Sequence, residues 1–139
     1  MPNPRKIKVI FYTNIWICFL IGKRLTSIKE YISNGRIQLI LTEQLITEIK
    51  LVTQRPKLQK YFNQESIEEL LSLIEIIGKI YKIKPKHHLS RDEKDSFLLD
   101  LIDKSKAEYL VTGDKDLLEL GQFQTASILT PKEFEEVLE

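Results

Sequence analysis

Cysteine is almost absent from this 139-residue sequence, in which Cys18 is the only one. A single cysteine cannot form a disulfide within the chain, so nothing points to an oxidising compartment and a cytoplasmic protein is expected. Long apolar runs are lacking too. No stretch approaches the roughly 18 apolar residues that span a bilayer, and the N-terminus has no signal-peptide core. We therefore predict no membrane association.

Charge of one sign is not in excess either. Lysine and arginine number 21 against 20 for aspartate and glutamate, so the formal net charge is +1. This balance excludes the global basic surface of many non-specific nucleic-acid binders, and any such contact needs a local patch. Lysine and arginine side chains are concentrated at residues 4–8, 54–60 and 79–88. Each of these segments is either such a patch or ordinary solvated surface.

The composition that is present fits one globular domain spanning residues 1–139, with 42% hydrophobic and 29% charged positions. Short β-rich runs alternate with helical patterns, which is typical of an α/β fold around a mostly parallel sheet. A helical pattern also runs from about residue 15 to residue 31. The predicted strands are residues 7–12, 36–41, 108–112 and 127–129.

Helix-start signals are found at three places. Thr42 is an N-cap candidate for a helix that ends at residues 55–56. Residues 66–69 form a capping box, and Thr130 begins a second one with proline at the first helical position. The expected buried faces of the helices are Leu45, Ile46, Ile49 and Val52; Ile67, Leu70, Leu71, Ile74 and Ile77; Phe97, Leu98, Leu101 and Ile102; and Phe134, Val137 and Leu138.

Polar groups follow two of the predicted strands, in "FYTN" at residues 11–14 and "VTGD" at residues 111–114. In parallel sheets, ligands bind outside the carboxyl ends of the strands. Gly113 permits a sharp turn, after which Asp114 projects from the strand end, and Asp116 follows at the start of a short helix. Ordinary turn and cap roles compete with a ligand role for both acids.

Three further acids lie on predicted helices. Glu48 borders a buried stripe, and Asp92 and Asp95 share one face of a helix that begins near Ser90 or Asp92, where Asp92 also suits a cap. If Glu48, Asp95 and Asp114 meet at one end of the sheet, their mutual repulsion calls for a cation. Carboxylate oxygens suit Mg²⁺ or Mn²⁺, which serve metal-assisted phosphodiester hydrolysis.

The whole chain resembles the PIN-domain nucleases, and in particular the small VapC-like PIN proteins classed as toxins of toxin–antitoxin pairs. The strongest likeness is "KAEYLVTGDKDLLELGQFQTASILTPKEF" at residues 106–134. Residues 90–102 and 39–49 are similar to the two other acidic segments of the family. Together these segments cover nearly the full length in the expected order.

The resemblance implies a three-layer α/β/α sandwich, a Mg²⁺ or Mn²⁺ site of one or two ions, and cleavage of single-stranded RNA. It also implies a cognate antitoxin protein as partner and allows a homodimer. Carried over by position, the second, third and fourth acids of the family fall on Glu48, Asp95 and Asp114, which would ligate the metal. The auxiliary positions are Asp92 and Asp116 as acids, and Thr13, Asn14 and Thr112 as ligand-orienting residues.

The first acid of the family pattern is missing, because Tyr12 stands where family members carry aspartate directly before "TN". A phenol is neutral at pH 7, supplies no anionic oxygen and fills space that metal-bound water would need. We therefore expect weakened metal binding and a loss of at least ~10² in rate.

Two explanations for Tyr12 stay open. Asp and Tyr codons differ by one base, so an expression host poisoned by an active ribonuclease could have selected a disarmed clone. Alternatively Tyr12 is native, and the protein is a catalytically degenerate PIN domain that binds RNA or a protein without cutting. The codon at the source locus separates them. A third hypothesis is a phospho-acceptor domain built on a strand-end aspartate. The sequence does not support it, because the first strand is not followed by a carboxylate.

Overall fold

A computed structural model of the chain describes residues 6–16, 35–60, 64–83 and 96–138. In these ranges a six-stranded sheet has the order β3-β2-β1-β4-β6-β5, with every neighbouring pair parallel except β5 and β6. The mostly parallel sheet confirms the sequence prediction. The strands are β1 (Ile7–Phe11), β2 (Ile37–Leu41), β3 (Lys79–Ile80), β4 (Tyr109–Val111), β5 (Gln122–Phe123) and β6 (Ala126–Leu129).

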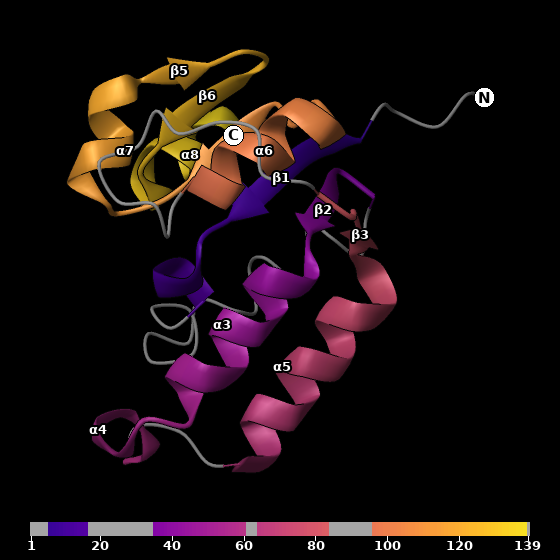
Figure 1. Cartoon of the computed structure of the whole chain (residues 1–139), viewed down its shortest axis with the longest axis vertical. Coiled ribbons are helices and arrows are strands. Elements are labelled where there is room, and N and C mark those ends of the chain that lie inside the picture. The colour runs from indigo at the N-terminus through magenta and orange to yellow at the C-terminus, as the bar shows by residue number, and fades with distance from the viewer. Residues whose placement is uncertain (1–5, 17–34, 61–63, 84–95, 139) are drawn as a thin grey trace.

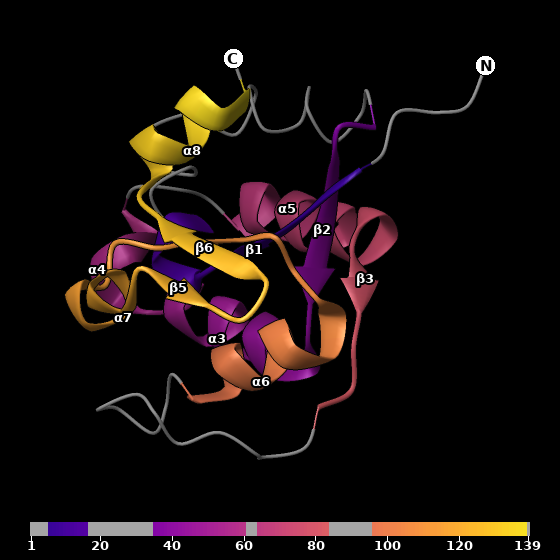
Figure 2. The same ribbon diagram turned by 90° about the horizontal axis from the view of Figure 1, so that it is seen from above.

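Helices cover both sides of the sheet, as expected for a three-layer α/β/α sandwich. Figure 2 shows α8 on one side of the sheet and α6 on the other. In Figure 1, α3 and α5 lie side by side below the strands, and Lys50 Nζ of α3 is 3.9 Å from Glu75 Oε1 of α5. None of the described helices combines the length and the apolar character that a bilayer span needs. The helices are α3 (Glu43–Thr53), α4 (Pro56–Gln59), α5 (Gln64–Ile77), α6 (Ser96–Ser105), α7 (Lys115–Leu120) and α8 (Pro131–Leu138).

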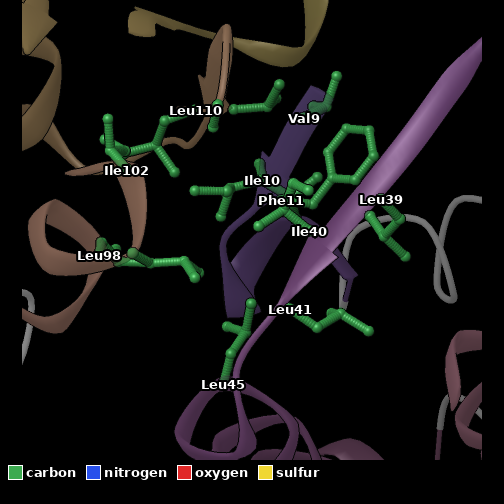
Figure 3. Packing of buried hydrophobic residues seen from close by; sticks show 14 of the residues in the cluster. Val9, Ile10, Phe11, Leu39, Ile40, Leu41, Leu45, Leu98, Ile102 and Leu110 are labelled. Carbon is green, nitrogen blue, oxygen red and sulfur yellow. The ribbon is translucent and has the colours of Figure 1, made fainter. Parts of the chain in front are cut away.

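The core forms around β1, whose last three residues are completely buried. A strand covered on both faces needs a continuous apolar run, which explains why "VIF" shows no polar alternation. Leu98 and Ile102 of α6 extend toward Ile10 of β1 and Leu110 of β4 (Figure 3). Fully burying each side chain of this size contributes about 1.5–3 kcal/mol. The predicted buried face of α6, Phe97, Leu98, Leu101 and Ile102, is confirmed.

An aromatic cluster holds the end of β1 in place. The Phe11 ring meets the Trp16 ring edge to face at 5.5 Å and the Phe134 ring of α8 at 5.6 Å. Such geometry is favoured by the ring quadrupoles. Because Phe11 directly precedes Tyr12, this packing fixes the point at which the chain leaves the sheet.

Several predicted helix features differ from the structure. Residues 66–69 do not cap α5, because good helix formers extend that helix back to Gln64 and place Ser66 inside its first turn. Thr42 does precede α3, but its side chain makes no capping hydrogen bond to the described helix. Val137 is 38% exposed, since Phe134 and Leu138, four residues apart, form the buried stripe of α8. The short elements β3, α4 and β5 were not predicted, and the helical pattern expected over 15–31 lies mostly outside the described residues.

The capping box at the start of α8 is confirmed and makes stability depend on pH. Thr130 N–H donates to Glu133 Oε1 at 2.9 Å, and Glu133 N–H donates to Thr130 Oγ1 at 3.2 Å. The hydrogen bond from the Thr130 backbone N–H to the carboxylate, together with the nearby Thr130 hydroxyl, holds the pKa of Glu133 below its ordinary value. The charged form is therefore favoured by folding, so its stabilisation is complete above the ordinary glutamate pKa and is lost as pH falls through the lower folded-state value.

We expect Glu133→Gln, which keeps the capping geometry without the charge, to be less stable than the parent at pH 7. The difference in free energy of unfolding should be smaller at pH 3, because a larger fraction of Glu133 is protonated there. Urea denaturation of the two proteins at both pH values measures this difference. If the difference in free energy of unfolding is the same at the two pH values, the charge of Glu133 is not the source of the pH dependence.

Candidate functional site

The candidate site lies at the carboxyl ends of β1 and β4, which are parallel neighbours. Phe11 pairs with Val111 in the register of the two strands, so the residues that follow, Tyr12 and Thr112, leave the sheet side by side. Tyr12 N–H donates to Val111 O at 3.1 Å, and Thr112 N–H donates to Leu129 O of β6 at 2.9 Å. Backbone hydrogen bonds thus fix the positions at which the chain leaves the sheet after β1 and after β4.

Beyond Tyr12 the chain turns at once into helical geometry, over residues 13–16. The Trp16 indole N–H donates to Phe11 O at 3.1 Å, and Ile15 N–H donates to Tyr12 O at 2.9 Å. These two bonds tie the helical turn back onto the end of β1. No local pattern in the sequence signals the hydrogen bond of Trp16.

Glu48 reaches the same place from α3. Leu45 and Ile49 bury one face of that helix, and Glu48 at its border is half-buried. The buried hydroxyl of Thr13 donates to Glu48 Oε2 at 3.1 Å. A hydrogen bond to a charged acceptor is stronger than one between neutral groups, so Thr13 orients the carboxylate toward the end of the sheet. Thr13 and Glu48 therefore lie together in the structure.

The turn after β4 brings Gly113 next to Asn14. Gly113 has no side chain, and a Cβ built there would lie 3.4 Å from Asn14 Nδ2, so Asn14 rests against this glycine. Thr112 Oγ1 accepts a hydrogen bond from Asp114 N–H at 3.1 Å. The loops after β1 and β4 therefore lie in contact at Asn14 and Gly113, which the sequence did not predict.

Asp114 is also a helix cap, which was one of the two interpretations of this residue that the sequence allowed. Its Oδ1 accepts from Leu117 N–H at 3.1 Å, which makes Asp114 the N-cap of α7. Asp116 is half-buried in the first turn of the same helix, where a negative charge suits the helix dipole. The cap hydrogen bond holds the Asp114 carboxylate at the strand end.

Tyr12 occupies the position directly after β1. Its side chain is half-buried and packs against the hydrophobic core. The position directly after β1 therefore carries a phenol and not a carboxylate. The sequence prediction that Tyr12 lies at the site is consistent with this arrangement.

A divalent cation at this site would need oxygen ligands, of which carboxylates are the strongest candidates. Glu48 and Asp114 offer the hard oxygen ligands that Mg²⁺ and Mn²⁺ prefer. Within the described ranges, however, no group of three histidine, cysteine or acidic residues is placed to hold a metal. Asp92 and Asp95 lie outside those ranges. Among the described residues, Glu48 and Asp114 are thus the candidate oxygen ligands, and Tyr12 adds no charge to them.

Ser96, which directly follows Asp95, begins α6. Its hydroxyl is buried and has no hydrogen-bond partner among the described residues. A buried hydroxyl without a partner costs free energy. Ser96 is thus the first described residue after Asp95, the predicted third acid.

Comparisons with known proteins support one family. A family model described as PIN domain matches residues 8–116. Functionally characterised proteins give no significant sequence match. Among solved structures, the crystal structure of Mycobacterium tuberculosis VapC20, described as a sarcin-ricin loop cleaving toxin, has a TM-score of 0.55 and 10% sequence identity to this chain. The match covers 84% of this chain and 97% of the other, and at that identity it shows the fold.

Proposed function

Because the chain belongs to the PIN domain family, we propose that it is a metal-dependent endoribonuclease of toxin type whose activity is impaired by Tyr12. The observation that carries the proposal is the meeting of Thr13, Glu48 and the turn around Asp114 at the carboxyl ends of two parallel strands. The fold likeness to a structure described as a sarcin-ricin loop cleaving toxin is in keeping with this proposal.

Each residue has a distinct role in this proposal. Glu48, Asp95 and Asp114 would hold Mg²⁺ or Mn²⁺, which when bound supplies a water of lowered pKa for attack on a phosphodiester. Thr13 holds the Glu48 carboxylate in place, and the α7 cap hydrogen bond holds that of Asp114.

The auxiliary residues complete the site. Asn14 lies against the turn at Gly113, where its amide would orient the substrate, and Thr112 positions the backbone before Asp114. Asp92 and Asp116 would add negative charge around the ligands. Two neutral side chains and two further acids thus support the three proposed ligands.

An antitoxin partner is part of the proposal. A small protein that fills the acidic end of the sheet would place an arginine against Glu48 and Asp114, since a guanidinium pairs bidentately with carboxylates. Co-expression with the small protein encoded beside this chain tests the toxin assignment. Failure to form a complex would remove the toxin role while leaving the nuclease proposal standing.

Metal binding can be tested without relying on activity. We expect Mn²⁺ to raise the Tm of the Tyr12→Asp variant by several degrees, because an ion at 100 times its Kd stabilises by about 2.7 kcal/mol. The protein with Tyr12 should shift much less. A matched Tyr12→Asn variant, equal in size to aspartate but neutral, should behave like the tyrosine form. Equal shifts in all three proteins would show that position 12 does not contribute to metal binding.

The second candidate function is a non-catalytic binding module for RNA or a protein. The packing of Tyr12 against the core favours it, because a ring accommodated in this way is compatible with a native residue. Cleavage of single-stranded RNA by the Tyr12→Asp variant with Mn²⁺ decides between the two functions.

A further inference from the structure

A hollow of about 570 Å³ lies at the end of the sheet opposite to the candidate nuclease site. Lys6 and Lys8 lie at the beginning of β1, whereas Tyr12 follows its end, so the two sites are separated by the length of the strand (Figure 1). The wall opposite these lysines comes from the α6–β4 loop and the β5–β6 hairpin. The lining residues are Lys6, Lys8, Lys106, Glu108, Gln122, Gln124 and Thr125.

Positive charge dominates the lining, with three lysines against one glutamate. Lys8 is half-buried and its Nζ donates to Ser105 O at 3.3 Å, at the carbonyl end of α6. Lys106 Nζ lies 3.6 Å from Asp103 Oδ1, in a pair whose lysine side chain is 60% exposed and whose aspartate side chain is 20% exposed. Three ammonium groups on one concave surface attract an anion, and exposed pairing of the kind made by Lys106 competes only weakly with it.

Backbone strain converges on the same hollow. Lys106, with a φ of 60°, and Gln124, with a φ of 51°, are the non-glycine residues with positive φ in the described part of the chain. Lys106 directly follows α6, where glycine or asparagine is usual. Gln124 is the first residue of the two-residue turn between β5 and β6, where glycine is preferred. Both positions thus carry a long polar side chain at a conformational cost, and both line the hollow.

The two loops are also held together. Thr125 Oγ1 donates to Ala107 O at 2.8 Å, which ties the β5–β6 turn to the residue after Lys106. Gln122 Nε2 donates to Gln124 O at 3.3 Å within the same hairpin. The opening therefore has walls that are fixed before a ligand arrives.

We propose that this hollow binds a small organic phosphate of nucleotide size. Its volume lies within the range of small-molecule sites, about 300–1,000 Å³. Lysine ammonium groups bind phosphate as point charges, and the glutamine side chains add amide donors and acceptors for a polar organic part. A concave opening with rigid walls favours a compact ligand over an RNA strand, whose backbone needs an extended track of cations.

The test is titration of the full chain with adenosine 5′-monophosphate, followed by calorimetry or by chemical shifts. Lys106→Gly and Lys6→Met should each weaken binding about tenfold, the effect of losing one charge-assisted hydrogen bond. Lys57→Met on exposed α4 is the matched control and should bind like the parent. Lys106→Gly also relieves the positive φ, so its Tm should be unchanged or raised, which separates loss of binding from loss of fold.

Titrations with other ligands show which part of the nucleotide is bound. Inorganic phosphate should displace the nucleotide, and adenosine should bind far more weakly, because the phosphate group is the anchor. No saturable binding at about 1 mM, the weak end of specific affinities, overturns the proposal. So does equal binding of adenosine, or equal weakening by Lys57→Met. A single-stranded oligonucleotide that binds here when the mononucleotide does not would also overturn it.

Discussion

Replacing Tyr12 with aspartate is expected to raise the rate of single-stranded RNA cleavage at least ~10²-fold in the presence of Mn²⁺ or Mg²⁺. Tyr12 follows β1 directly and lies beside Thr112 at the end of β4, so we expect an aspartate there to lie near Glu48 and Asp114. The substitution exchanges a neutral phenol for an anionic oxygen ligand and removes a ring from the space that solvent needs.

The comparison is made on one fluorescent RNA with the parent, Tyr12→Asp and Tyr12→Asn, each with metal and with a chelator. Cleavage that appears in Tyr12→Asp alone, and only with metal, would establish a nuclease disarmed by one side chain. Tyr12→Asn controls for the removed ring, because it is as small as aspartate but uncharged. Silence from all three folded proteins would favour the binding-module function.

Phe11 packs against Trp16 and Phe134, so removal of the ring at position 12 leaves the support of β1 in place. Folding of each variant is checked by circular dichroism before activity is compared. A variant that cleaves RNA equally well with and without chelator would contradict metal dependence while leaving the nuclease function standing.

The sheet could be predicted because buried parallel strands have strong local signals. The apolar run of β1 was expected over 7–12 and is observed over Ile7–Phe11, and β6 differs from its prediction by one residue at its start. Two-residue strands such as β3 and β5 have no period to detect, because their pairing is decided by neighbours distant in sequence. The failed prediction at Ser66 has a related cause, since helix-forming residues upstream outweighed a local cap motif.

The site was predictable to the extent that it depends on topology. The carboxyl ends of β1 and β4 share one edge, so polar residues after each strand were expected to meet there, and the Thr13–Glu48 hydrogen bond joins α3 to them. The approach of Asn14 to Gly113 and the Trp16 hydrogen bond depend on side-chain geometry across the fold. No spacing in the sequence encodes either contact.

Asp114 combines two roles that substitution can separate. Asparagine is as good an N-cap as aspartate, whereas alanine loses the hydrogen bond to Leu117 N–H. We therefore expect Asp114→Asn to change the free energy of unfolding by only a few tenths of a kcal/mol, and Asp114→Ala to lower it by about 1 kcal/mol. In the Tyr12→Asp background both should reduce RNA cleavage ~10²-fold or more, because both remove the charge at the site.

Urea denaturation and RNA cleavage, measured on the same preparations, test this separation. Glu119→Gln, a neutralised and exposed acid on the same helix, is the control and should leave cleavage near the parent level. If Asp114→Asn cleaves RNA as fast as its parent, Asp114 is only the cap of α7, and metal binding must then rely on the other acids. If instead stability is retained while cleavage is lost, the same carboxylate that starts α7 also serves the chemistry, and the cap hydrogen bond is what holds it in position.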